Sequence, residues 1–385
     1  MKRPRTQHAS ARNGRGARAG RRAPLAVALS AALAWVVPGQ EARAIEPAGM
    51  EPVRVDARTI RRFSPLGNRA GLLTFLGGAE LRGRRPLASL SGLARTGPDR
   101  FLAVSDGGDW VALSLSRDAN GRIAGARASA APIDADVRGR RRDKGDVDAE
   151  AVALMADGSA LVAFEHRNRI LRFDAAGRRT GVIDLPIPQR ELRRNKGLEA
   201  VAASPPGSRL AGAAVTVAER SIDRRGDIFA AILSGPGRGV FTVRRTDGFD
   251  VTDAAFLPDG DLILLERRYR GRLSLRMRLR RIPGAALRRG ARVDGPVLME
   301  AGLASEIDNM EGLTVHTDDR GTVLTLVSDD NDSFLQRTLL LEFLLPEGAG
   351  RGAAPPPEAA PANVPVPTVR PRALGRLSTT GGHAS

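Results

Sequence analysis

The chain has 385 residues, of which 42% are hydrophobic and 4% aromatic, and it contains no cysteine. This length suits one large all-β domain or two ordinary domains, and the lack of cysteine excludes disulfides, thiolate metal sites and cysteine nucleophiles. The net charge is +17, but all but three of the 60 basic residues are Arg, and they are scattered through the sequence. Scattered Arg with few aromatic residues disfavours nucleic-acid binding, because basicity alone gives only non-specific attraction.

The N-terminal segment has the three parts of a secretory signal peptide. A basic stretch ends at Arg21-Arg22, an apolar run follows from Ala23 to Val37, and Ala42-Arg43-Ala44 supplies a small-residue cleavage signal. The apolar run is too short to span a bilayer stably, and no later segment predicts membrane insertion. We therefore expect residues 1–44 to be removed near Ala44, by the general or the twin-arginine route, and the mature protein to be periplasmic or secreted. A basic tail followed by an alanine-rich helix is the alternative.

Five segments share one plan. Each begins with a small or acidic residue, continues with an apolar strand, a turn and a second apolar strand, and ends with an acid. They begin at Ser91, Glu150, Glu199, Asp253 and Glu311, and these positions are separated by 59, 49, 54 and 58 residues. Four-stranded propeller blades recur at a similar spacing, and Asp-Gly between apolar runs is a strong hairpin signal. The pattern predicts an all-β propeller of four-stranded antiparallel blades.

The number of blades is expected to be six, with seven as the alternative. The extended pieces Val53–Phe63 and Leu72–Leu81 predict a further blade, and Arg337–Leu345 would complete it from the C-terminal end. Pairing of the two chain ends would close the ring and protect strand edges. We therefore place the propeller domain at residues 45–346. Residues 347–385 are rich in Pro, Ala and Gly, and this composition predicts a disordered tail.

The acids of each hairpin are expected to lie side by side at its open end, because residues numbered symmetrically about a turn face each other. Two like charges that face each other destabilise the pairing of their strands, and the pKa values of two facing carboxyl groups rise unless a cation lies between them. Carboxylate oxygens without thiols suit Ca²⁺ and, less well, Mg²⁺. Bonds to the backbone or to neighbouring Arg are the alternative. The candidate metal ligands are Asp106, Glu150, Glu165, Glu199, Glu219, Asp253, Glu266, Glu311, Asp329 and Asp330.

Several of these segments resemble the phytase-like family, whose domain carries the description "esterase-like activity of phytase". The resemblance covers roughly Leu76 to Phe343, and it implies a propeller that hydrolyses phosphate or carboxylic esters with calcium. The resemblance also implies that seven of these acids are motif positions of the family, namely Glu150, Glu165, Glu199, Glu219, Glu311, Asp329 and Asp330. Two departures are Ser91, where other hairpins have an acid, and the basic run Arg267–Arg270. The matching segments are Leu90–Leu93, Val104–Gly108, Asp148–Ala153, Phe164-Glu165, Asn195–Val201, Asn309–Leu313 and Ser328–Asp332.

Other hydrolase and nucleotide-binding patterns are absent from the sequence, including Gly-x-Ser-x-Gly, the phosphate-binding loop and the Rossmann fingerprint. We therefore expect calcium-assisted hydrolysis of a small anionic ester. Glu199 would accept a proton, while Lys196, Arg220 and Arg267 would stabilise negative charge. His166, next to Glu165, is a further candidate for a general base.

Two other functions are compatible with the same pattern. A gluconolactonase-type lactonase also uses a propeller with acids around a metal, typically with Asn beside Glu, and Asn195, Asn309 and Asn331 are available here. A non-enzymatic periplasmic scaffold with structural calcium is the third reading, since propellers carry many unrelated functions. The oligomeric state cannot be read from the sequence.

Overall fold

The computed structural model describes residues 45–133, 144–271 and 274–351. The predicted signal peptide, and the predicted tail from residue 352 onward, lie outside the described residues. No helix within the described ranges is long and apolar enough to cross a membrane.

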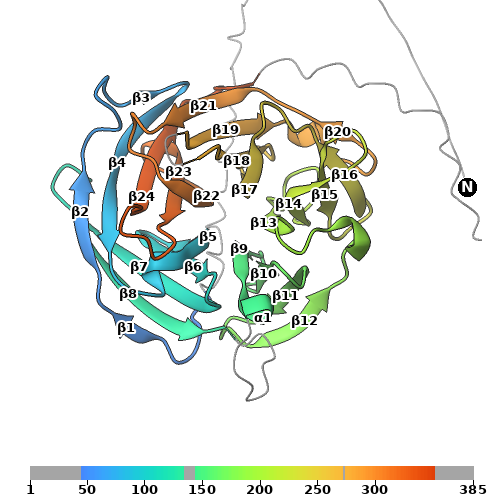
Figure 1. The fold of residues 1–385 in the computed structure, drawn as a ribbon, viewed down its shortest axis with the longest axis horizontal. Coiled ribbons are helices and arrows are strands. Elements are labelled where there is room, and N and C mark those ends of the chain that lie inside the picture. The colour runs from blue at the N-terminus through green and yellow to red at the C-terminus, as the bar shows by residue number, and fades with distance from the viewer. Residues whose placement is uncertain (1–44, 134–143, 272–273, 352–385) are drawn as a thin grey trace, which may run out of the picture. The chain divides into compact units, whose positions relative to one another are not determined.

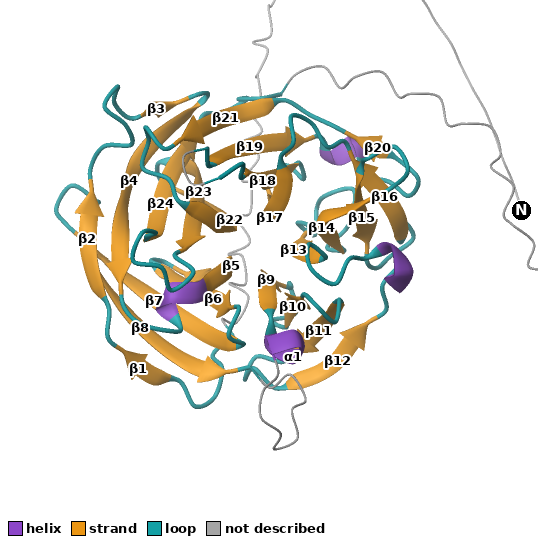
Figure 2. Cartoon of the chain, in the orientation of Figure 1, coloured by secondary structure: helices purple, strands orange, loops and turns teal. Residues whose placement is uncertain are grey.

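Strands make up nearly all regular structure of the described chain, as expected from the sequence (Figure 2). Helix is limited to the four-residue α1 (Lys144–Val147) and three short 3₁₀ turns. The turns are η1 (Leu87–Ser89), η2 (Gln189–Glu191) and η3 (Gly284–Ala286).

The strands form five sheets placed around a common centre, each with one edge strand innermost (Figure 1). We number the sheets I to V and give their strands from the inside outward. Sheet I contains β5 (Leu90–Gly97), β6 (Arg100–Ser105), β7 (Asp109–Arg117), β8 (Ile123–Pro132) and β1 (Glu51–Val53). Sheet II contains β9 (Ala149–Leu154), β10 (Ala160–Phe164), β11 (Arg169–Phe173) and β12 (Arg179–Ile183). Sheet III contains β13 (Leu198–Ala203), β14 (Ala214–Ile222), β15 (Ile228–Ile232), β16 (Gly239–Val243) and, parallel to β16, β20 (Arg292–Val293).

Sheets IV and V complete the arrangement. Sheet IV contains β17 (Asp250–Phe256), β18 (Leu262–Arg268), β19 (Arg276–Ile282) and β21 (Val297–Gly302). Sheet V contains β22 (Asn309–Asp318), β23 (Gly321–Asp329), β24 (Thr338–Leu345), β4 (Leu73–Arg82) and β2 (Asp56–Ile60), with β3 (Arg69–Ala70) beside β4. The five innermost strands contact one another in order, β5 with β9, β9 with β13, β13 with β17, β17 with β22, and β22 with β5. This is a β-propeller arrangement, so the predicted all-β propeller class is confirmed, although three of the five sheets have more than the four strands predicted for a blade.

The Asp-Gly hairpins occur where the sequence predicts them. Gly158 and Gly260 have φ angles of 81° and 89°, which a residue with a side chain adopts only at a cost. Their N–H groups donate to the carbonyls of Met155 and Leu257, each at 2.9 Å. These turns join the first and second strands of sheets II and IV.

The prediction of six blades is wrong, because the described residues form five sheets. The N-terminal strands β2 and β4 build no blade of their own and instead extend sheet V. Strand β4 pairs with the C-terminal strand β24, with Ala79 opposite Leu340 and Glu80 opposite Leu339, as the neighbouring blue and orange-red strands of Figure 1 show. The predicted pairing of the two chain ends is therefore found, and it covers the edge that β24 would otherwise expose.

Apolar side chains pack between neighbouring sheets, as propellers require. Between sheets IV and V, for example, Phe63, Phe75 and Phe343 form an aromatic cluster with ring centroids 5.1–5.5 Å apart. This packing fixes the positions of the innermost strands, which carry the candidate site.

Candidate functional site

A β-bulge interrupts the innermost strand of every sheet close to its first residue. Bulges re-aim side chains and often lie next to active sites. The residues at the bulges are Ser91 with Gly92, Glu150, Glu199, Thr252 and Glu311. The side chains of Ser91 and the three Glu line one cavity of about 1030 Å³. In sheet IV, the Thr252 hydroxyl instead donates to the Met310 carbonyl at 2.9 Å.

The bulges also correct the expected facing of acids across each hairpin. Each bulge shifts the pairing by one residue, so Glu165 lies opposite Asp148, to whose carbonyl it donates its N–H at 2.9 Å. In the same way Asp329 pairs with Asn309. The two acids of a hairpin are thus displaced by one step, although both still reach the cavity.

Seven of the ten predicted metal ligands line this cavity, and so do the four predicted catalytic residues. Acids that the sequence analysis did not select also line it, notably Asp148 and Asp250. Both stand two positions before a bulged residue, as Asn309 does, and this spacing is a signal that could have identified them. The seven ligands are Asp106, Glu150, Glu165, Glu199, Glu219, Glu311 and Asp329, and the catalytic candidates are Lys196, Glu199, Arg220 and Arg267.

The carboxylates are crowded at the centre of the cavity. One oxygen each of Glu165, Glu199 and Glu219 lies within 4.8 Å of the other two. Burial, followed by repulsion from Glu150 and Glu219, raises the pKa of Glu199 well above its usual value. Burial and the nearby Asp148 and Glu165 do the same to the pKa of Glu150, and burial raises the pKa of Asp329 to about 8. These acids therefore lack sufficient positive charge from the protein itself.

The Asn195–Glu199 segment holds the acids of sheets II and III in place. Oε1 of Glu165 accepts hydrogen bonds from the backbone N–H groups of Lys196 and Gly197, the latter at 3.0 Å. The Lys196 ammonium donates to both oxygens of Glu219, at 2.8 and 3.0 Å. A Cβ at position 197 would lie 1.9 Å from the Asn168 side-chain oxygen, so only glycine fits there.

Arg267 occupies in sheet IV the place that acids occupy in the other sheets. In or directly after the second strand, sheets I, II, III and V have Asp106, Glu165, Glu219 and Asp329. The counterpart in sheet IV, opposite Asp250, is Arg267. The guanidinium donates to Glu311 and Asn309, and at 3.2 Å to Glu219. Burial lowers the pKa of Arg267, but Glu311, Glu219 and Glu199 together raise it above its ordinary value. Arg267 is thus a permanent cation that joins sheets III and V.

Three predicted metal ligands lie outside the cavity, which corrects their placement. Glu266 is buried and accepts hydrogen bonds from Arg278 and Arg280, each at 2.6 Å. Asp253 accepts backbone N–H groups of Ala254 and Leu313 at 2.8 and 2.7 Å, and so ties β17 to β22.

The third of these residues, Asp330, accepts the Thr338 hydroxyl at 2.9 Å. It lines a separate pocket of about 260 Å³. Sheet IV differs because its bulge falls at Thr252, one residue before Asp253, and because Arg267 and not Glu266 lies opposite Asp250.

Thermal stability without divalent cations is expected to fall as the pH rises from 5 to 8. The pKa values of Glu150, Glu199 and Asp329 are higher in the folded than in the unfolded chain. Stability is therefore lost as the pH rises from their ordinary pKa, near 4, to the raised pKa, which is about 8 for Asp329. Calcium should restore the melting temperature mainly at pH 8, where these groups must ionise. Melting curves at pH 5, 6.5 and 8, with calcium and after its removal, check this. A calcium effect of equal size at all three values would contradict it.

The chain is similar to several solved structures, including three with low sequence identity. The Malassezia sympodialis allergen Mala s 1 is 14% identical, over 77% of this chain and 96% of that one, with a TM-score of 0.36. A putative gluconolactonase is 12% identical over 78% and 94%, with a TM-score of 0.38. The PQQ-bound aldose sugar dehydrogenase of Streptomyces coelicolor is 14% identical over 76% and 99%, with a TM-score of 0.36. No curated protein matches the chain.

The family comparison gives a more specific result. The model of the phytase-like family, described as "Esterase-like activity of phytase", matches residues 85–332, which is more than half of the chain. The match spans the five bulges and all the acids of the cavity. The chain therefore belongs to the phytase-like family.

Proposed function

We propose that this chain is an exported, calcium-dependent hydrolase of small anionic phosphate or carboxylic esters. The observation that carries the proposal is the triad Glu165, Glu199 and Glu219, whose carboxylate oxygens lie within 4.8 Å of one another in the cavity. Membership of the phytase-like family supports the reaction class. Export is proposed from the signal-peptide pattern of residues 1–44.

The donor set fits calcium. The triad offers only hard carboxylate oxygens, which Ca²⁺ prefers. Glu199 accepts no hydrogen bond from any described residue, and burial with repulsion from Glu150 and Glu219 raises its pKa despite the attraction between Glu199 and Arg267. A divalent cation would supply the missing charge, and Glu150, which lines the same cavity and repels Glu199, is the next candidate ligand. When bound, such a cation polarises the ester and makes a bound water more acidic.

The cationic side chains of the cavity divide into two groups. Lys196 and Arg267 are already bonded to Glu219 and Glu311, so we assign them the task of positioning these carboxylates. Arg220 is freer, because its side chain is 42% exposed and its ion pair with Asp250 is 3.9 Å long. Arg220 is therefore the group that we propose to bind the substrate anion, and Glu199 the group that accepts a proton.

Replacement of Arg220 by Ala is expected to raise the KM for an anionic ester about 10- to 100-fold. A hydrogen bond to a charged group contributes about 1.5–3 kcal/mol, which corresponds to that range. Arg220→Lys should recover part of the loss, because it restores the charge without the planar fork. Arg238→Ala, at an exposed ion pair with Asp184 outside the cavity, is the control. An unchanged KM in Arg220→Ala would show that another group binds the substrate anion.

The substrate class is tested by hydrolysis assays of the full chain. The panel consists of a phosphomonoester, phytate, a short-chain carboxylic ester and a lactone, each with calcium and with chelator. Calcium-dependent turnover of a phosphate or carboxylic ester is the expected result. Absence of turnover, with calcium still raising the melting temperature, would replace the proposal by a scaffold with structural calcium.

Lactone hydrolysis is the second candidate, and one observation favours it. Asn195, Asn309 and Asn331 all line the cavity beside the carboxylates, which is the combination expected of a gluconolactonase-type site. Asn309 donates to Glu311 at 2.7 Å, so its amide is already oriented toward an acid of the cavity. Turnover of the lactone alone in the panel would select this function.

A further inference from the structure

We propose that Asp148, Glu165 and His166 form a second metal site with a mixed nitrogen and oxygen donor set, suited to a first-row transition metal such as Mn²⁺ or Zn²⁺. The inference rests on the proposed function for its use in hydrolysis, but metal binding is testable by itself. It concerns two residues, Asp148 and His166, that are outside the calcium ligands named above.

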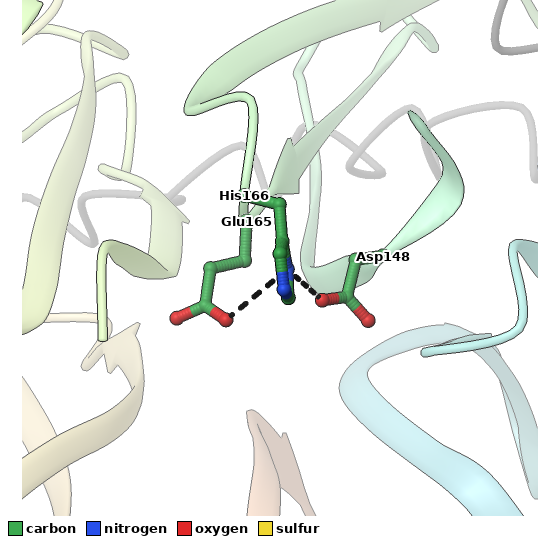
Figure 3. Close-up of side chains that lie close together, drawn as sticks. All are labelled: Asp148, Glu165 and His166. Atoms are coloured by element: carbon green, nitrogen blue, oxygen red, sulfur yellow. Dashed lines mark ion pairs between the residues drawn. The ribbon is translucent and has the colours of Figure 1, made fainter. Parts of the chain in front are cut away.

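The three side chains meet because of the strand order in sheet II. Asp148 immediately precedes β9, while Glu165 and His166 immediately follow the neighbouring strand β10. All three line the cavity. Figure 3 shows the imidazole between the two carboxylates, with Nδ1 at 2.6 Å from Asp148 Oδ2 and 3.6 Å from Glu165 Oε2. One donor atom from each residue lies within 4.8 Å of the other two.

The imidazole nitrogen itself points to a missing ligand. Nδ1 of His166 is buried, and no described residue forms a hydrogen bond with it, although two carboxylate oxygens flank it. Buried polar atoms are nearly always satisfied, so an exception needs a physical reason. A cation held jointly by the nitrogen and the two carboxylates would give Nδ1 of His166 a partner.

The donor types decide which cation fits. Calcium takes oxygen ligands, whereas imidazole nitrogen suits Mn²⁺, Zn²⁺ and related ions. Glu165 belongs both to this group and to the triad with Glu199 and Glu219. Two ions would therefore share one carboxylate, as in the paired-metal sites of many hydrolases.

Pulsed electron paramagnetic resonance of Mn²⁺ tests the site directly. The full chain without a histidine tag is stripped of metal, and Mn²⁺ alone is added below one equivalent. The expected spectrum shows ¹⁴N coupling from a bound imidazole, and His166→Gln should abolish it. The control is His316→Gln, because His316 lies in β22 and is not among the residues of the cavity. That variant should keep the coupling.

Affinity provides a second readout. Both His166→Gln and Asp148→Asn should weaken Mn²⁺ binding about tenfold or more, since changes around a metal site typically cost 10- to 100-fold. Calcium affinity should change much less in His166→Gln. Circular dichroism in chelator shows whether each variant folds, and Asp148→Asn decides the question if His166→Gln does not fold.

Mn²⁺ bound without ¹⁴N coupling, or with coupling that survives His166→Gln, would overturn the inference. The histidine would then be a partner of Asp148 alone. Intact coupling together with no turnover in the ester panel would instead reject the proposed hydrolase and leave this site standing.

Discussion

Replacement of Glu199 by Gln is expected to lower calcium affinity, and calcium-dependent ester hydrolysis, at least about 100-fold, the scale typical of a lost metal ligand or proton acceptor. Glu199 lies at a bulge, one of its oxygens is close to those of Glu165 and Glu219, and no described residue donates a hydrogen bond to its carboxylate. Gln keeps the shape of the side chain and removes the charge. Calorimetric titration with calcium and the ester assay measure the two effects.

The same substitution should raise the melting temperature in chelator. Glu199 is repelled by Glu150 and Glu219, so a neutral residue relieves that repulsion in the metal-free chain. Lower affinity combined with higher metal-free stability distinguishes a lost ligand from a damaged fold. Glu191→Gln, at an exposed residue of η2, is the matched control. Unchanged calcium affinity in Glu199→Gln would contradict the assignment of the triad.

Replacement of Glu266 by Gln is expected to destabilise the protein by about 3–5 kcal/mol without changing calcium affinity. Glu266 is fully buried between Arg278 and Arg280, whose side chains are each 1% exposed. Removal of the shared carboxylate leaves two buried guanidinium groups undercompensated, and broken buried pairs cost this amount. Each Arg keeps one further acid, Asp247 or Asp294, which places the loss toward the lower end.

Urea denaturation of Glu266→Gln measures the loss of stability. Glu300→Gln is the control, because Glu300 pairs with the half-exposed Arg276 on the adjacent strand, and such pairs contribute at most about 1 kcal/mol. A loss of calcium affinity in Glu266→Gln would restore this residue to the metal site. A stability change no larger than that of the control would show that the buried pairs contribute little.

The fold class was predictable from the sequence because hairpin signals are local. Asp157-Gly158 and Asp259-Gly260 fix turns through the positive φ of the glycine, and the apolar runs around them supply the strands. The blade number was not predictable in this way. The pairing of Leu73–Arg82 with the C-terminal strand β24 was predicted, but not that β24 also pairs with β23 and so joins the N-terminal strands to the last hairpin in a single sheet.

The position of the cavity acids was predictable, whereas their pairing was not. A bulge adds one residue to one strand, and nothing in the composition of Glu150 or Glu199 and their neighbours signals it. In sheet IV this single step puts Thr252 and not Asp253 at the bulge, and brings Arg267 and not Glu266 to the cavity. The register of the two strands in each hairpin therefore decides which acids line the cavity.

The most direct test of the account is calorimetric titration of the metal-free full chain with calcium at pH 8 in two buffers of different ionisation enthalpy. We predict saturable binding with release of protons, because burial and crowding raise the pKa values of Glu199, Glu150 and Asp329 and a cation must displace those protons. Absence of saturable heat and of any calcium-dependent shift in melting temperature would contradict the proposed cation site.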